Sequence, residues 1–559
     1  MIKNFFKKIS SVDLIKETEI YLSKIDKIEL KTFFILFTTM FLLYSVLTYP
    51  MFWGNHDWDL MFSEICKQEG LYIGRYSIVW PELLFIKNYH VYFLVNLFAY
   101  SFLPLFVIYS LKFFKVPKNL FVYTLIGLFF CTSPFIYFIF YYRISTLEYA
   151  LLPFLTLISI QLTSKINSRN SVIKNIILFF SSLVLLGIFV LGAYQPIITM
   201  VIMFAFFKLL SDFTENKFKN FITVIKNNIF IFVVIFLAVI INFVIYKFID
   251  IYMPNTLAKN FYNFQLIEVK NLFPEIISYF KNFIPLYIFT SYPYISFSYR
   301  ILLFIFYILG IFTSVKYYLK SNSDKKNLFV LLFILFILLF SSEITYLVST
   351  FKNPILRLES FNSLQLYFLS LILIFKCGQN FEKNIAYFLL IPVIYTSIIA
   401  VLSVEQTFSM IKSAEENIQQ QILTRIINDN NFDKDKTYHY IQLGHYKQLG
   451  PKLYKSNKYS QDSTELFYNI IHEFDPNVYI YRFGYLSGLI NLLHTTDNDS
   501  YNMQKISQKL DKDINDWILT KADVFPNPTS VFIHNDKIIL VMDKDALEQY
   551  KKYINSINN

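Results

Sequence analysis

The sequence contains few charged residues, few glycines and few cysteines. Only 16% of its 559 residues are charged, whereas 55% are hydrophobic and the mean hydropathy is +0.44; soluble globular chains carry roughly 25% charge. This balance excludes a disordered chain, a fibre and an ordinary cytosolic enzyme, and it indicates a polytopic membrane protein. With 12 glycines the chain has no glycine-rich phosphate loop, which disfavours a nucleotide-sugar site. Cys66, Cys131 and Cys377 lie too far apart to suggest a disulfide framework or a zinc site.

The sequence contains many long apolar runs. A helix of about 20 apolar residues crosses the hydrocarbon of a bilayer, and we predict about eleven such spans. They cover residues 32–49, 90–111, 119–141, 147–163, 175–193, 196–211, 228–247, 300–317, 327–348, 362–377 and 384–403. After residue 403 the segments become short, polar and mixed, and none is long enough to span.

The net charge of +11 has two interpretations, a nucleic-acid footprint or the cytoplasmic loops of a membrane protein. The excess of Lys and Arg belongs entirely to residues 1–403, since the tail is net acidic. It lies mostly in alternate segments, namely 1–31, 112–118, 165–174, 208–226, 316–326 and 376–383. This is an orientation signal rather than a nucleic-acid site. It predicts a cytoplasmic N-terminus, with loops 50–89 and 249–299 and the tail on the outer face.

Three parts are therefore expected along the chain. Residues 1–31 have an amphipathic pattern that suits a helix on the inner membrane surface, although a plain solvated helix is an equal alternative. Residues 32–403 form the membrane part. Residues 404–559 are expected to form an extracytoplasmic α/β domain, large enough for a core of its own. Its predicted elements are helices at 404–428, 466–474, 504–519 and 546–554, a strand at 437–443, and a hairpin made by 530–533 and 537–542.

The first outer loop contains the most suggestive polar residues. Asp57 and Asp59 flank Trp58 just beyond the first span, and two carboxylates there can act as a general base and its partner. A bare Asp-x-Asp is more typical of a solvated loop. Further polar residues follow in other outer segments, and we expect these loops to converge: Arg75, Glu82, Arg143, Glu148, Tyr194, Gln195, Lys352, Arg357 and Glu359. An arginine there can bind a phosphate with two hydrogen bonds.

Each of these residues also has a structural interpretation. Arg143 suits the outer end of a span as an anchor whose side chain snorkels to the interface. Tyr194 and Gln195 suit a tight turn between helices before Pro196. Glu82 follows Pro81, a placement that suits the first turn of a helix.

The polar knot 54–59, followed by the Gly74–Arg75 segment, resembles the Gtr type II family of serotype-converting O-antigen glucosyltransferases, which are GT-C-like membrane enzymes. The Tyr194–Gln195 turn is similar to that family, as are the strand 438–444 and the stretch 524–541 that closes the tail. One departure concerns the first loop, where the family commonly has adjacent acids and here Trp58 separates them. Of the two acids, Asp57 is chosen over Asp59 as the base.

The resemblance implies a membrane glycosyltransferase of the bacterial inner membrane. Such enzymes take a hexose, usually glucose, from a polyprenyl-phosphate donor and attach it to a lipid-linked or surface polysaccharide on the outer face. The loop aspartate then serves as general base, and Arg75, Arg143 or Arg357 would face the leaving lipid phosphate. Membrane lipid and the two substrates are the expected partners, with no nucleic acid. Inversion and retention both stay open. His56 and Asp59 have the ligand types for a divalent metal, but no metal site is assigned, because a solvated loop is the preferred interpretation.

Two other functions compete with this one. An O-antigen polymerase or ligase uses the same lipid carrier, but those enzymes more often have a long outer loop rich in Arg and His, whereas 249–299 contains only scattered lysines. A flippase or transporter of a lipid-linked sugar would need a polar cavity at mid-membrane. The scarcity of ionisable residues in the middle of the spans counts against it.

Overall fold

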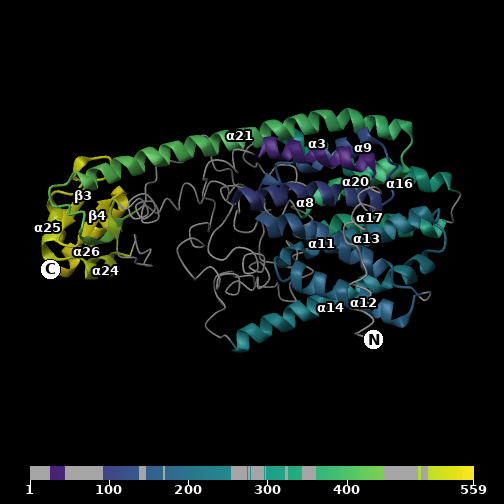
Figure 1. The fold of residues 1–559 in the computed structure, drawn as a ribbon, viewed down its shortest axis with the longest axis horizontal. Coiled ribbons are helices and arrows are strands. Elements are labelled where there is room, and N and C mark those ends of the chain that lie inside the picture. The colour runs from purple at the N-terminus through teal and green to yellow at the C-terminus, as the bar shows by residue number, and fades with distance from the viewer. Residues whose placement is uncertain are drawn as a thin grey trace, which may run out of the picture. The chain divides into compact units, whose positions relative to one another are not determined.

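The structure is a computed structural model, and it describes residues 26–44, 92–137, 146–167, 170–252, 297–321, 325–342, 361–444, 489–492 and 502–558, with 274, 277 and 295 as isolated positions. The chain divides into two compact units, residues 1–403 and residues 404–559. The first is a bundle of helices, and the second combines a small sheet with helices (Figure 1).

Each predicted span overlaps a helix of the structure. The helices are α3 (Lys27–Leu43), α8 (Tyr92–Phe113), α9 (Leu120–Cys131), α11 (Thr146–Ser164), α12 (Val172–Val184), α13 (Ile198–Glu215), α14 (Phe221–Tyr252), α16 (Phe297–Lys320), α17 (Lys325–Ser342), α20 (Ser363–Cys377) and α21 (Asn380–Ile427). Among the described residues, 5 helices are long and apolar enough to cross a membrane, and shorter apolar helices accompany them. The predicted mostly helical fold with candidate membrane spans is thus confirmed, while the number of spans stays a prediction.

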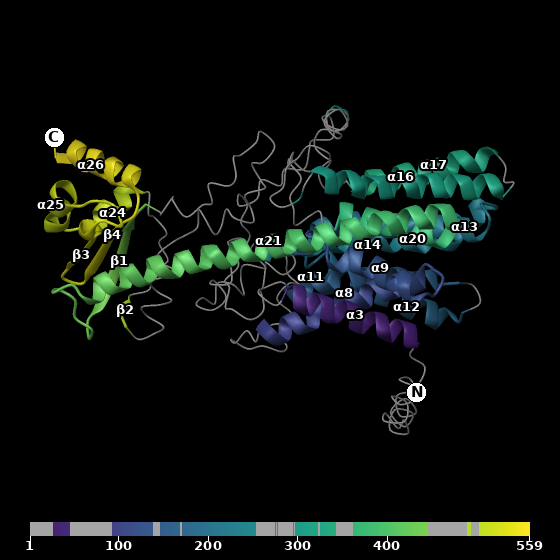
Figure 2. The same cartoon turned by 90° about the horizontal axis from the view of Figure 1, so that it is seen from above.

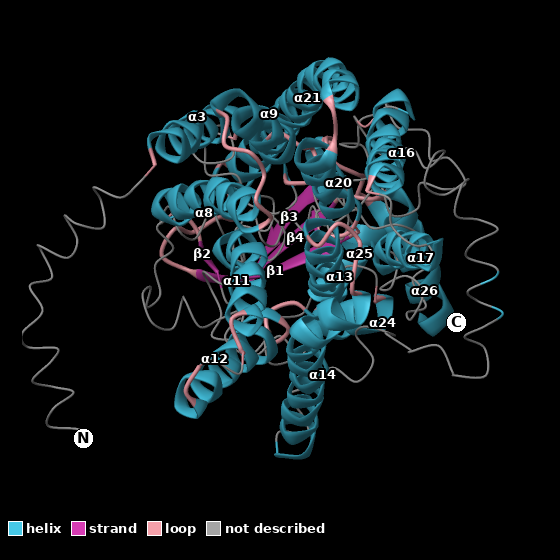
Figure 3. Cartoon of the chain, turned by 90° about the vertical axis from the view of Figure 1, so that its right-hand side faces the viewer, coloured by secondary structure: helices cyan, strands magenta, loops and turns pink. Residues whose placement is uncertain are grey.

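Helix α20 forms the centre of the bundle. Every residue from Ser363 to Phe375 is buried, and the helix packs against α9, α13, α16 and α17 (Figure 3). Helices α12 and α14 lie at the edge instead. They expose apolar side chains, which a lipid environment accommodates and water does not: Val172, Ile173, Ile177, Phe180, Phe236, Phe243 and Phe248.

Several element boundaries differ from those predicted. The continuous helix expected over 119–141 is wrong, because α9 ends at Cys131 and turns follow. Pro134 explains this, since a proline disfavours helical backbone at the residue before it. The helix expected at 175–193 continues from α12 as the π-helix η2 (Leu185–Val190). The last predicted span and the polar helix after it are one helix, α21.

The basic loops of the bundle meet at one end. Lys118 lies 2.7 Å from Asp26, the residue that caps α3, and Lys115 of the same loop lies 2.5 Å from Glu215 at the end of α13. Lys376, at the end of α20, lies 2.7 Å from the same Glu215. Two further pairs, Lys112 with Glu29 and Lys316 with Glu382, join the same helix ends. We call this the basic end of the bundle.

Glu215 is the central acid of the basic end, and its charge depends on two lysines. Burial raises the pKa of Glu215, but hydrogen bonds from Lys115 and Lys376 outweigh burial and place the pKa below its ordinary value of 4.5. A lowered pKa means that the pairing stabilises the fold fully above pH 4.5 and is lost as the pH falls through the folded-state pKa.

Glu215→Gln is therefore expected to lower the free energy of unfolding by about 1–2 kcal/mol at neutral pH. Most of that loss comes from Lys376, whose side chain is only 10% exposed. Thermal unfolding of the full-length protein in detergent measures it, and the difference from the unmodified protein should vanish in acid. Asp513→Asn is the matched control, because Asp513 is 74% exposed and should change nothing. A difference that persists in acid would contradict the charge explanation.

The second unit contains a four-stranded sheet in the order β2-β1-β4-β3. β1 (Thr437–Leu443) runs parallel to β2 (Asn491–Leu492) and to β4 (Lys537–Val541), while β3 (Val531–His534) pairs antiparallel with β4. The predicted strand 437–443 and the predicted hairpin are confirmed. The predicted helix 504–519 is two helices, α24 (Met503–Lys509) and α25 (Lys512–Thr520), and α26 (Lys544–Asn558) closes the chain. The predicted helix 466–474 lies outside the described residues.

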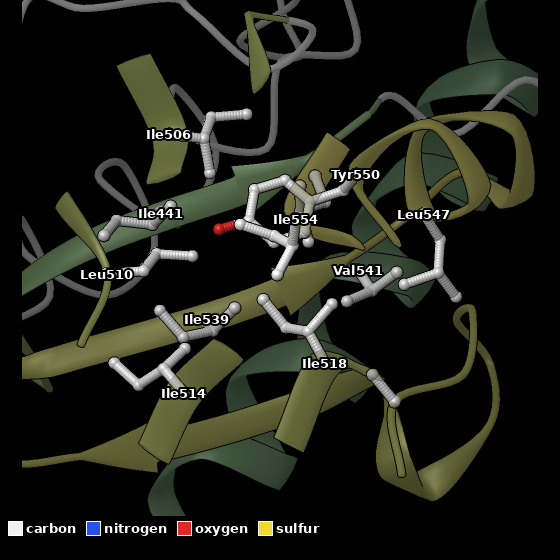
Figure 4. Packing of buried hydrophobic residues seen from close by; sticks show 12 residues of the cluster. Ile441, Ile506, Leu510, Ile514, Ile518, Ile539, Val541, Leu547, Tyr550 and Ile554 are labelled. Carbon is white, nitrogen blue, oxygen red and sulfur yellow. The ribbon is translucent and has the colours of Figure 1, made fainter. Parts of the chain in front are cut away.

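Side chains alternate between two cores on either face of this sheet. On one face Tyr438, Tyr440, Ile538 and Leu540 pack with the last turns of α21. On the other, Ile441, Ile539 and Val541 pack with α24, α25 and α26: the side chains that meet them are Ile506, Leu510, Ile514, Ile518, Leu547, Tyr550 and Ile554 (Figure 4). The period of two along each strand produces this division.

Arg425 of α21 holds the stretch before β3. Its guanidinium donates to the carbonyl oxygens of Pro526 and Asn527 at 2.5 and 2.8 Å and to Ser530 Oγ at 3.2 Å, and it lies over the ring of Phe525. One planar group with several donors thus satisfies the oxygens of an irregular segment. The hydrogen bonds from Arg425 therefore give residues 524–531, part of the family-like stretch in the sequence, a structural role.

Candidate active site

The predicted site residues fall into three groups in the structure. Asp57, Asp59, Arg75, Glu82, Arg143 and Arg357 lie outside the described residues. Glu148 belongs to α11 and Gln195 to the short 3-10 helix η3 (Gln195–Ile197), but their side chains are not described. Tyr194 is fully described and is 2% exposed. The described residues next to the predicted ones show how these segments are held.

Three of the predicted segments meet at an aromatic cluster. Tyr149, the neighbour of Glu148, lies 5.2 Å from Tyr194 between ring centroids. Phe361, which follows Arg357 in the chain, lies 5.6 Å from Tyr194 and 6.3 Å from Tyr149. The three rings are mutually in contact and buried. The starts of α11, η3 and α20 are thus held together. The convergence of the predicted site residues themselves stays a prediction.

A hydrogen bond reinforces this meeting point. Thr199 Oγ1, in the first turn of α13, lies 2.5 Å from Asn362 Oδ1, in the residue before α20. Asn362 is 1% exposed, and among the described residues its Nδ2 has no hydrogen-bond partner. A buried amide that is only half satisfied is unusual in a folded protein.

A second cluster fastens the end of α3, after which the chain continues toward Asp57 and Asp59. The hydroxyl of Tyr44 donates to the carbonyl oxygen of Cys131 at 3.0 Å, and the hydroxyl of Tyr100 donates to the carbonyl oxygen of Tyr44 at 3.0 Å. Tyr44 also contacts the ring of Tyr137 at 6.3 Å. The chain leaves toward Asp57 from Tyr44 and toward Arg143 from Tyr137, so both segments start from neighbouring points.

Both clusters lie at the end of the bundle opposite the basic end. At the start of α3 its cap Asp26 forms an ion pair with Lys118, and Tyr44 caps the other end of the helix. α13 begins near Thr199 and finishes at Glu215, and α20 begins after Asn362 and carries Lys376 in its last turn. The helices lie side by side (Figure 2), so opposite helix ends mark opposite ends of the bundle. Among the described residues, the two aromatic clusters lie at one end of the bundle, and the lysine–carboxylate pairs lie at the other.

The helix before Tyr194 has an unusual form. In η2 the amide of Leu191 donates to the carbonyl oxygen of Leu186, a five-residue spacing. Gly187 allows η2 to approach α14 closely, since a Cβ at this position would lie 3.3 Å from the Cα of Ala238. A π-segment changes the direction in which later side chains point and often occurs at functional sites. Here it precedes the turn that places Tyr194 in the aromatic cluster.

A comparison with protein families identifies the chemistry. The family model described as glucosyl transferase GtrII matches residues 55–375, which is more than half of the chain. The chain belongs to the GtrII family. Comparison with curated proteins and with solved structures gives no match.

Membership of GtrII makes this chain a glucosyltransferase, an enzyme with a sugar donor and an acceptor. The matched region begins two residues before Asp57 and ends within α20. It therefore includes all of the predicted site residues as well as Thr199 and Asn362. The second unit, 404–559, lies outside the match. Enzyme membership also sets aside the alternative of a non-enzymatic flippase.

Three buried polar residues of this GtrII member, Thr199, Asn362 and Glu405, are not marked as site candidates by the sequence. Thr199 and Asn362 sit at the ends of apolar runs, and nothing in their immediate sequence marks them as a pair. Glu405 of α21 is 2% exposed, and no described residue pairs with its Oε1. An acid directly after a predicted span was the available signal for Glu405, since buried carboxylates near a membrane are costly and usually functional.

No metal site is apparent in the part of the chain that the structure describes, where no group of three or more His, Cys, Asp or Glu side chains is placed to hold an ion. His56 and Asp59, the two residues with suitable ligand types, lie outside that part.

Proposed function

We propose that this protein transfers glucose from a polyprenyl-phosphate donor to a lipid-linked or surface polysaccharide of the O-antigen type, on the outer face of the bacterial inner membrane. The observation that carries the proposal is the GtrII match across 55–375. The meeting of the segments next to Glu148, Gln195 and Arg357 supports it, because a transferase must bring residues from distant loops around two substrates.

The proposed chemistry is a transfer in which the acceptor hydroxyl attacks the anomeric carbon of glucose. Asp57 takes the proton of that hydroxyl, because an unassisted hydroxyl is too weak a nucleophile at neutral pH. As the new bond forms, the bond from the anomeric carbon to the phosphate oxygen breaks and polyprenyl phosphate leaves. Arg75, Arg143 and Arg357 stabilise the negative charge on this phosphate. Asp59 assists Asp57.

The remaining predicted residues are assigned to substrate binding. Glu82, Glu148 and Gln195 offer oxygen and amide groups to sugar hydroxyls, and Tyr194 holds the turn that carries Gln195. This assignment is supported by the position of Tyr194 between Tyr149 and Phe361.

The proposed orientation places the basic end of the bundle in the cytoplasm and the aromatic clusters at the outer face. The lysines that pair at the basic end come from the alternate loops of the sequence pattern, and cytoplasmic loops are those enriched in Lys and Arg. The donor sugar would thus meet the enzyme in the outer leaflet, and the second unit would be extracytoplasmic.

Reconstitution of the full-length protein in lipid vesicles tests the donor. With polyprenyl-phosphate [14C]glucose and a purified O-antigen acceptor, we expect label to pass to the acceptor as single glucose residues. UDP-[14C]glucose without a lipid carrier is expected to give no transfer. Transfer from UDP-glucose alone would overturn the proposed donor. Lengthening of the acceptor by repeat units, rather than by single hexoses, would instead favour a polymerase.

A further inference from the structure

Asn362 occupies a helix-start position but does not behave as a helix cap. Asparagine at the residue before a helix commonly accepts a hydrogen bond from the first turn of its own helix. Here the side chain makes no such bond and contacts Thr199 of α13 instead. The start of α20 is therefore linked to α13 through the Asn362 amide, and this amide does not cap its own helix.

The second atom of the amide is left unsatisfied. Thr199 engages one end of the group at 2.5 Å, while Nδ2 finds no partner among the described residues. With an exposure of 1%, the side chain has no access to water that could replace a partner. Because buried polar groups in folded proteins are nearly always paired, an unpaired one suggests that a ligand supplies the missing bond.

The surroundings indicate what this ligand is. Asn362 follows Phe361, one of the three rings that join the starts of α11, η3 and α20, and it lies within the GtrII match. The substrate that this family transfers is glucose. A sugar hydroxyl both donates and accepts hydrogen bonds, so it pairs with either atom of a side-chain amide. The free Nδ2 is a donor, so the missing partner must accept a hydrogen bond, which a sugar hydroxyl does and a lipid chain does not. A phosphate oxygen also accepts, and deoxy analogues of glucose distinguish a sugar hydroxyl from it.

We propose that Asn362 binds one hydroxyl group of the transferred glucose and thereby contributes to sugar selectivity. The inference rests on the proposed function, since it takes polyprenyl-phosphate glucose as the donor. Because Asn362 is 1% exposed, a local opening is required for the sugar hydroxyl to reach the amide. Thr199 orients the amide from its other end and is a positioning residue.

Deoxy sugars test this proposal directly. The full-length protein in vesicles would be given polyprenyl-phosphate glucose and its 2-, 3-, 4- and 6-deoxy analogues, and kcat/KM would be measured for each. For the unmodified protein we expect one analogue to react at least about tenfold more slowly than glucose, because its binding leaves the buried amide unpaired. Asn362→Leu is expected to react with glucose and with that analogue at similar, reduced rates.

Two further variants separate binding from folding. Asn362→Ser retains a residue suited to a helix start, but its side chain is too short to reach the sugar, so it should lose the same selectivity. Thr199→Val removes the group that orients the amide, so it should weaken the selectivity for the same hydroxyl without abolishing it, as expected for a positioning residue. Unchanged selectivity in a folded Asn362→Leu or Asn362→Ser protein would overturn the inference. Inactivity of the unmodified protein with polyprenyl-phosphate glucose would instead refute the proposed donor, so the two failures are distinguishable.

Discussion

Asp57→Asn is expected to lower kcat for glucose transfer by about a thousandfold, with the protein still inserted and folded. General-base catalysis by a positioned carboxylate contributes roughly 100- to 10,000-fold. Asparagine preserves the size of the side chain but cannot accept the proton of the acceptor hydroxyl. Because binding does not require proton transfer, the KM for the lipid-linked donor should change little.

The measurement compares single-turnover rates of the reconstituted variants, with membrane insertion checked by protease protection. Asp59→Asn is the matched control, since it removes the neighbouring carboxylate of the same loop. Under our assignment it retains substantial activity. Full activity of Asp57→Asn, together with loss of activity in Asp59→Asn, would transfer the base assignment to Asp59. Full activity in both variants would show that neither acid of this loop is the general base.

Gly444→Ala is expected to destabilise the second unit by about 3 kcal/mol or more. Gly444 follows β1 with φ +72°, a left-handed conformation that costs other residues about 1–2 kcal/mol. A Cβ at this position would lie 2.3 Å from the Cβ of Asp543 and 2.7 Å from that of Ala546, at the start of α26. These atoms belong to short side chains held by the backbone, so they cannot yield, and overpacking adds about 1–3 kcal/mol.

Fluorescence of Trp517 follows this change in a full-length protein whose other tryptophans, Trp53, Trp58 and Trp80, are replaced by Phe. The Trp517 ring stacks 4.7 Å from Phe532 within the second unit. The variant should lose this signal at lower temperature and become sensitive to protease within 404–559. Asn535→Gly is the matched control. Asn535 also has a positive φ, 54°, but it lies in the turn between β3 and β4, where glycine fits at least as well. Equal stability of the Gly444→Ala protein would contradict the steric argument.

Much of this fold was accessible from the sequence, because a membrane helix is defined by local composition. A run of apolar residues long enough to cross a bilayer is recognisable without knowledge of its neighbours, so each predicted span overlaps a helix. The boundaries were less accessible. The end of α9 has a local signal in Pro134, whereas the π-helix at 185–190, which packs closely against α14 at Gly187, has none in its own sequence.

The candidate site was accessible only in part. The basic loops predict which loops share the outer face, and this orientation stays a prediction. Tyr194, singled out from its turn, lies in the aromatic cluster of the structure. Thr199 and Asn362 were not identified, because they are 163 positions apart and each is an ordinary polar residue beside an apolar run. Their importance arises from a contact, and a contact between distant residues leaves no mark in either local sequence.

The sequence by itself determined that this protein is mostly helical, with apolar helices suited to a membrane and an α/β tail. It also showed a resemblance to the Gtr type II family, which the family match confirms. Hydropathy, charge placement and strand alternation are local or periodic properties, so the order of residues is enough to reveal them. Only the tertiary structure decided which helix ends meet at the aromatic cluster, which amide is buried with a free atom, and why Gly444 must be glycine. Those outcomes depend on how distant segments pack, because burial and hydrogen bonding are set by neighbours in space.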